Sequence, residues 1–168
     1  MLNTIMECVP NFSEGRDLAK VEKIVDAFRG KEGVKLLDYS SDKDHNRTVV
    51  TVIGEIEPLG DAVIEAIGIA AQIIDLNHHQ GEHPRMGATD VLPLVPISGI
   101  TLEECAALAR TLAERIANEL RIPTYCYEAA AYTEERKNLA ICREGEYEAL
   151  PEKMATKEKA PDFGARPY

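Results

Sequence analysis

The stretch VKLLDYSSDKDHNRTVVTVI, residues Val34–Ile53, decides the fold. Its two ends, Val34–Tyr39 and Thr48–Ile53, have the composition of β-strands. The polar connection SSDKDHNR between them suits the loop of a hairpin. We therefore expect two antiparallel strands joined by a polar loop.

Helical patterns flank this hairpin on both sides. Apolar residues recur on one face from Asp17 to Phe28, and Gly30 follows as a stop signal. A second helix is expected from Pro58 to about Asp75, because proline is pre-shaped for the first helical turn.

Two further apolar runs predict the outer strands. Thr4–Pro10 reads as a first strand, and Val91–Ile97 as a fourth strand. Pro93 and Pro96 cannot donate to a ladder, which favours an edge position or an irregular segment here. The order matches an α+β fold with a ferredoxin-like βαββαβ sheet and helices packed on one face.

An additional helix and strand are expected next. Thr101 and Glu104 form a capping box that starts a helix to about Leu120. Thr124–Ala129 is predicted as a fifth strand.

After Ala131 the chain is more charged and less periodic. One helical turn or two is expected at Glu146–Leu150, and a solvated connector at Lys153–Lys159. Pro161–Gly164 looks like a turn.

The second face of the sheet needs a cover. Val49, Val50, Val52 and Ile53 make the third strand apolar on both sides. We infer a partner sheet, from another domain or another subunit.

Composition narrows the class of protein. Among 168 residues, 19 Lys and Arg stand against 29 Asp and Glu, a net charge of -10, which argues against nucleic-acid binding. There is no stretch of about 20 apolar residues and no secretory signal at the start, so we expect a cytoplasmic protein with one core and no membrane partner. The four cysteines form no C-x-x-C pair, so neither a zinc ribbon nor a disulfide framework is indicated, and most of them are expected to be buried.

A histidine-rich loop is the sharpest candidate site. His78, His79 and His83 lie near Glu82 and Arg85. A histidine can exchange protons near neutral pH while an arginine holds a carboxylate. A solvated polar loop remains an alternative, and a metal site is less favoured because the spacing does not match a helical zinc pair.

Two other polar segments are candidates. In Asp42–Arg47, Asn46 and Arg47 could bind an amide or carboxylate, or the segment could be a soluble turn. Asn11–Arg16 follows the first strand and precedes a helix, where anions often bind. These residues by themselves indicate an anion-binding, acid-base site.

Several long motifs resemble the amino-terminal subdomain of the formiminotransferase-cyclodeaminase family. They are Glu7–Gly15 (ECVPNFSEG), Asp44–Val49 (DHNRTV), Gly81–Ala88 (GEHPRMGA), Arg143–Pro151 (REGEYEALP) and the terminal Pro161–Gly164 (PDFG). The likeness covers almost the whole chain. It implies that residues 1–160 form this subdomain and that 161–168 begin a linker to a second one.

The resemblance implies transfer of a formimino group from N-formimino-L-glutamate to N5 of tetrahydrofolate, a co-substrate, in histidine degradation and without a metal. His83 would be the acid-base group. Substrate binding would fall to five residues, and folate binding to one: Arg47, Arg85, Asn46, Glu82 and Asn11 for substrate, and Gly164 for folate.

Two departures from the family pattern leave alternatives open. Ser40 stands where the family usually carries an acid, so Asp38, Asp42 or Asp44 would have to replace it. The second ferredoxin-like subdomain does not follow within these residues, so we expect a homo-oligomer or a partner subdomain. The alternatives are a non-catalytic folate-binding or assembly module and, less favoured, a hydrolase of formimino compounds.

Overall fold

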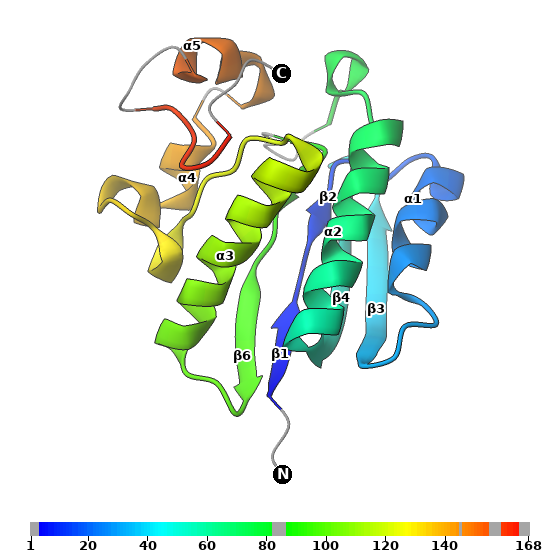
Figure 1. The fold of residues 1–168 in the computed structure, drawn as a ribbon. Helices are drawn as coiled ribbons and strands as arrows, with labels where there is room; N and C mark the ends of the chain where they lie inside the picture. Colours follow the sequence, from blue (N-terminus) through cyan, green and yellow to red (C-terminus); the bar gives the residue numbers. More distant parts are fainter. Residues whose placement is uncertain (1–3, 82–86, 145, 155–158, 165–168) are drawn as a thin grey trace. The chain divides into compact units, whose positions relative to one another are not determined.

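A computed structural model describes residues 4–81, 87–144, 146–154 and 159–164 (Figure 1). It divides into two compact units, Met1–Thr101 and Leu102–Tyr168, where composition predicted a single core. The first unit holds an antiparallel sheet and two long helices, and the second is mainly helical. The expected mixture of helices with an antiparallel sheet is confirmed.

The predicted hairpin is present and longer than expected. Strands β3 (Val34–Asp42) and β4 (Arg47–Glu55) pair from Val34 opposite Gly54 to Asp42 opposite Arg47. The polar residues 40–42 pair with β4, so only 43–46 form the turn. Polar side chains misled the prediction because the edge strand β3 exposes one face to solvent.

Short strands complete the sheet on the other side of β4. Strands β1 (Ile5–Cys8) and β2 (Asn11–Phe12) pair with β4, and β6 (Leu94–Ser98) and β5 (Thr89–Val91) lie beyond them. The first strand therefore continues past its proline, and the fourth is interrupted before β6. The predicted edge position of the fourth strand is confirmed.

The two helices of the first unit lie on one side of the sheet (Figure 1). Helix α1 (Leu18–Val25) begins after Asp17, whose carboxylate accepts from two backbone amides, and a 3₁₀ turn, η1 (Asp26–Phe28), follows. Helix α2 (Ile56–Ile73) begins two residues before Pro58.

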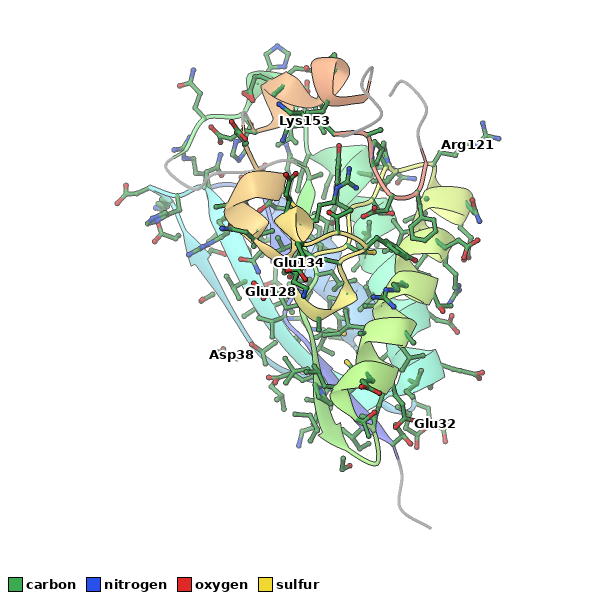
Figure 2. The ribbon with its side chains drawn as sticks, turned by 90° about the vertical axis from the view of Figure 1, so that its left-hand side faces the viewer. Glu32, Asp38, Arg121, Glu128, Glu134 and Lys153 are labelled. Carbon is green, nitrogen blue, oxygen red and sulfur yellow. The ribbon has the colours of Figure 1, made fainter. Side chains whose placement is uncertain are left out.

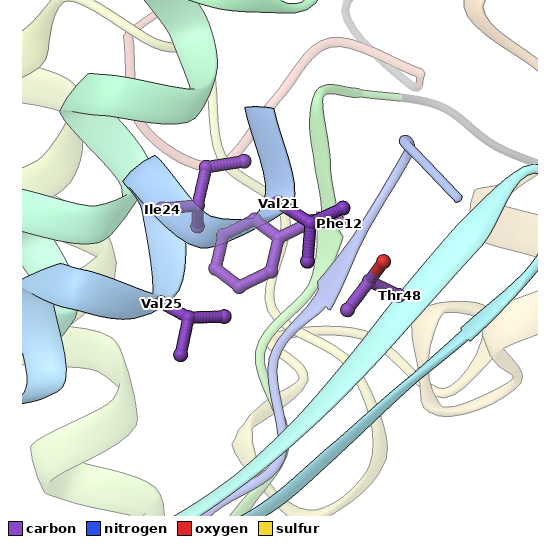
Figure 3. Close-up of a pocket in the computed structure, with 5 residues that line it drawn as sticks. All are labelled: Phe12, Val21, Ile24, Val25 and Thr48. Atoms are coloured by element: carbon purple, nitrogen blue, oxygen red, sulfur yellow. The ribbon is translucent and has the colours of Figure 1, made fainter. Parts of the chain in front are cut away.

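Alternation along β4 separates the two faces of the sheet. The even-numbered residues 48–54 are buried, whereas 47, 49, 51 and 53 are half-buried. Phe12 and Thr48 line a small hollow with α1 residues Val21, Ile24 and Val25, which has no space for a water molecule (Figure 3). This hollow is packed core. We call the opposite side of the sheet the outer face.

The second unit begins with the helix that the capping box predicted. Helix α3 (Leu102–Leu120) follows Thr101 directly. The predicted strand Thr124–Ala129 is wrong: it makes only an isolated bridge from Thr124 to Phe163, and then a 3₁₀ turn, η3 (Glu128–Ala130). The Cys126 amide donates to the Asp162 carboxylate at 2.7 Å, so a side chain takes the bond that a strand ladder would use.

Short helices fill the remainder of this unit. They are η4 (Glu135–Lys137), α4 (Leu139–Cys142), η5 (Tyr147–Ala149) and α5 (Leu150–Met154). The helical turns predicted near Glu146–Leu150 are confirmed. Lys153 (labelled in Figure 2) was wrongly placed in a solvated connector: it is 8% exposed and donates to the Cys142 carbonyl at 2.8 Å. Residues 155–158 of that connector lie outside the described residues.

A part-buried ion pair joins Arg136 to Asp162 in the second unit. Arg136 lies 2.7 Å from Asp162, with side chains only 12% and 10% exposed. Arg136 also donates to the Ala160 carbonyl and covers the Tyr125 ring. We call Tyr125, Cys126, Arg136 and Asp162 the Asp162 cluster.

Candidate functional site

Polar segments of the first unit converge around the β3–β4 turn. They are residues 13–16 after β2, the turn with its flanks at 42–47, residues 75–81 after α2, and residues 87–88 before β5. We call this set the turn cluster. Hydrogen bonds join all four segments, which brings together the three polar motifs singled out in the sequence.

Asn46 stands at the centre of the turn cluster. Its side chain is 6% exposed, and its backbone has a positive φ of 54°, which asparagine tolerates better than most residues. Oδ1 accepts from the Gly15 amide at 2.9 Å, and Nδ2 donates to the Gln80 carbonyl at 3.1 Å. One amide therefore ties two distant segments to the turn.

Ser13 makes a second tie. Its hydroxyl donates to the Gly87 carbonyl at 2.7 Å, and its amide donates to the Ala88 carbonyl at 2.8 Å. Thr48 donates to the Glu14 carbonyl at 2.5 Å, so the segment after β2 is also fixed to β4. These bonds hold the start of α1 and the start of β5 at one end of the sheet.

Histidines and carboxylates line the exposed side of the turn cluster. His45 Nδ1 lies 3.0 Å from Asp42 Oδ2, and His78 Nδ1 lies 2.7 Å from Asp75 Oδ2. Hydrogen bonds from the His45 backbone and side chain lower the pKa of Asp42, and the His78 side chain lowers the pKa of Asp75. His79 Nε2 lies 3.3 Å from the Asn46 carbonyl. The cluster therefore holds proton-exchanging groups beside carboxylates.

Candidate residues share the outer face of the sheet next to this cluster. Ser40 pairs with Val49, which also pairs with Asn11, so all three lie in one row. Asp38 and Arg47 lie on the same face: Asp38 is two residues before Ser40 in β3, and Arg47 is two residues before Val49 in β4. Figure 2 shows Asp38 on the side of the sheet away from α2. The side-chain Nδ2 of Asn11 donates to the Val9 carbonyl at 3.0 Å.

The predicted site residues are thus distributed unevenly. Asn46, Arg47 and Asn11 belong to one end of the first unit. Glu82, His83 and Arg85, with the whole 82–86 segment, lie outside the described residues. Gly164 belongs to the second unit, where its φ is +74° and an added Cβ would lie 3.2 Å from that of Ala117.

Sequence reasoning missed the linking roles of Ser13 and Asn46. An asparagine in a tight turn is a known signal for positive φ, but its partners at Gly15 and Gln80 lie 31 and 34 residues away. Ser13 gave no signal, because its burial depends on β5 pairing with β2.

In the described part of the chain, no group of three or more His, Cys, Asp or Glu residues could hold a metal ion, and no helix is both long and apolar enough to cross a bilayer. All four cysteines are buried, where burial of most of them was predicted. Burial raises the pKa of Cys126 to about 11, so this thiol remains protonated at neutral pH.

Comparison with known proteins identifies the family. Residues 5–168 match the model for the formiminotransferase domain, N-terminal subdomain. A glutamate formimidoyltransferase of Streptococcus pyogenes serotype M1 is 48% identical over 162 residues, covering 96% of this chain and 54% of that protein. A glutamate formimidoyltransferase of Thermoplasma acidophilum is 45% identical over 163 residues, with 96% and 54% coverage.

A longer relative matches the same region. The formimidoyltransferase-cyclodeaminase of Sus scrofa is 45% identical over 163 residues, covering 97% of this chain and 30% of that protein. The chain thus spans about half the length of the two glutamate formimidoyltransferases, and less of the cyclodeaminase. The match over 5–168 shows that the chain belongs to the formiminotransferase N-terminal subdomain family.

Proposed function

We propose that this chain supplies the acid-base half of a glutamate formimidoyltransferase. The reaction transfers the formimino group from N-formimino-L-glutamate to N5 of tetrahydrofolate. The observation that carries the proposal is the convergence of the family's motifs: hydrogen bonds from Asn46 and Ser13 join the segments around NFSEG, DHNR and the two ends of GEHPRMGA.

The proposed chemistry needs one proton-exchanging group. N5 attacks the amidine carbon, a new N–C bond forms, and the bond from that carbon to the glutamate nitrogen breaks. The proton lost by N5 is given to the departing nitrogen, which yields glutamate and 5-formiminotetrahydrofolate. A single histidine can serve both steps, and we assign this role to His83.

Substrate carboxylates need cationic partners in a protein with a net charge of -10. We propose Arg47 and Arg85 for this role, because guanidinium groups bind carboxylates in a bidentate way. Asn11 and Glu82 are proposed to contact the same substrate, and Gly164 the folate. Arg47 lies on the outer face, two residues along β4 from Val49, the residue that pairs with Asn11, and this position supports the assignment.

We further propose a ferredoxin-like sheet whose outer face is covered by a second subdomain. The order of strands, β3, β4, β1 with β2, and β6 with β5, supports this topology. Exposed apolar side chains on the edge strands support the cover: Leu37 is 48% exposed and Ile97 is 53% exposed. A second copy of this chain or a carboxyl-terminal half could provide it.

The proposal is tested by assaying 5-formiminotetrahydrofolate formation. The chain is measured alone and fused to the carboxyl-terminal half of the Streptococcus pyogenes relative. Turnover is expected in the fusion, with a loss of at least about 100-fold for His83→Ala, the usual contribution of a general acid-base group. The matched control is His78→Ala, which removes an exposed histidine of the same loop. Full activity of His83→Ala, or no turnover in a folded fusion, would refute the proposal.

A non-catalytic folate-binding module is the second candidate. Ser40, which cannot act as a carboxylate, lies between Asp38 and Asp42 on the outer face and favours it. Binding of folinate by a fusion without turnover would support this candidate. If the missing acid is the reason, Ser40→Asp should restore turnover, whereas Ser41→Asp on the other face should not.

A further inference from the structure

We infer that Asn46 and Ser13 are positioning residues that fasten the two ends of the 82–86 segment without contacting substrate. The inference rests on the proposed function, because its catalytic consequence passes through His83. The bonds themselves lie wholly within the described residues: Asn46 holds Gln80, and Ser13 holds Gly87 and Ala88.

Both polar atoms of the Asn46 side chain already hold backbone groups, in a residue that is only 6% exposed. Its oxygen accepts from the Gly15 amide, and its nitrogen donates to the Gln80 carbonyl. Loss of either bond would leave a backbone N–H or carbonyl in this buried surrounding without its partner, which costs about 1–3 kcal/mol. The geometry therefore favours a linking role.

Ser13 is buried more deeply, with 1% of its surface exposed. Both its hydroxyl and its amide donate to the residues that follow position 86. Because β2 itself is paired with β4, this contact ties those residues to the centre of the sheet.

Close glycine contacts make the ties rigid. A Cβ on Gly81 would lie 2.5 Å from the His45 carbonyl oxygen and 2.7 Å from the Asn46 Cβ. A Cβ on Gly15 would lie 2.3 Å from the Asp42 carbonyl oxygen. Both flanking segments thus press their backbones against the turn, so that small shifts of the turn move both.

Such anchoring matters for acid-base catalysis. A proton is transferred efficiently only when the group lies within hydrogen-bond reach of the reacting atom, and a misplacement of about 1 Å can cost about 100-fold in rate. We therefore expect loss of either anchor to lower kcat by about 10- to 100-fold while KM changes much less.

Two substitutions of Asn46 separate anchoring from folding. Asn46→Asp keeps an acceptor for the Gly15 amide but turns a carboxylate oxygen toward the Gln80 carbonyl. Asn46→Gly tolerates the positive φ but loses both bonds. Asn138→Asp is the matched control, because the side chain of that exposed asparagine accepts from the Ala140 amide, an acceptor role that a carboxylate keeps.

The pH profile gives a signature that general loss of stability would not. The Gln80 carbonyl favours the protonated form of the carboxyl introduced by Asn46→Asp, and that form can donate as the amide did. We expect kcat of Asn46→Asp, divided by that of Asn46→Gly, to rise as pH falls. The nearby titrating groups His45, His79 and Asp42 and the charged Arg47 are common to both variants, so the ratio cancels their effect.

A second readout does not depend on activity. Trypsin cleavage after Arg85, relative to cleavage after Lys137, should accelerate at least several-fold in Asn46→Asp and in Ser13→Ala, and should be unchanged in Asn138→Asp. The same fusion is used for both readouts.

The outcomes separate the two proposals. Accelerated cleavage in a protein without transferase activity would refute the proposed function but support the anchoring role of Asn46 and Ser13. Unchanged cleavage, or a rise in KM with kcat unaltered, would overturn the positioning role.

Discussion

The turn cluster and the Asp162 cluster are both dense in polar groups, yet they use them differently. Around Asn46, neutral side chains bond to backbone atoms of distant segments, and histidine-carboxylate pairs stay at the surface. In the Asp162 cluster, a part-buried ion pair, a thiol and a phenol are enclosed together. Burial raises the pKa of Tyr125 to about 12 and that of Cys126 to about 11. The difference teaches that polar density marks a reactive site only where solvent and ligand can reach it.

The largest expected effect comes from breaking the Arg136–Asp162 pair. Asp162→Ala removes the carboxylate that faces the Arg136 guanidinium and accepts from the Cys126 amide, which should cost about 3–5 kcal/mol of unfolding free energy in urea titrations. The neighbouring Lys137→Met breaks an exposed pair with Glu134 and should cost less than about 1 kcal/mol. Equal losses in the two variants would show that burial does not distinguish this pair.

The close approach in the turn cluster should give a smaller effect. Gly15→Ala forces a Cβ against backbone oxygen of Asp42, and we expect a loss of about 1–3 kcal/mol in thermal or urea unfolding. Gly30→Ala is the control: nothing lies within 4 Å of an added Cβ there, so only its positive φ of 67° opposes the change. If Gly30→Ala were the more damaging variant, backbone conformation and not close packing would limit these positions.

The smallest effect concerns the exposed Asp42–His45 pair. The pKa of Asp42 should titrate below its ordinary value of about 3.9 when followed by carboxyl NMR. A carboxyl group whose pKa is lowered in the folded protein contributes stability at pH values above its ordinary pKa. This contribution is lost as the pH falls through the lowered pKa. In His45→Ala the pKa should rise only in part, because the backbone amide of residue 45 still donates to the carboxylate. A complete return to the ordinary value would mean that the imidazole alone causes the shift.

Local pattern predicted most long elements, because each depends on its own periodicity or capping. Helix α3 ends at Leu120 as expected, and β3 and β4 form the expected hairpin. The strand predicted at Thr124–Ala129 failed because Asp162, 36 residues from Cys126, takes its backbone amide. The prediction that Lys153 is solvated was wrong for a similar reason. Nothing in the sequence around this charged residue indicates that its side chain donates to the Cys142 carbonyl.

The same division holds for the candidate site. The family resemblance, the acidic composition, the main helices and the hairpin all follow from the amino-acid sequence alone, because motifs, charge and periodicity depend on residues close together in the chain. Only the tertiary structure decided that Asn46 and Ser13 join residues 31 to 74 positions away. It also decided which face of β4 is buried beneath α1 and α2. Such contacts depend on strand register and chain path, which no local pattern contains.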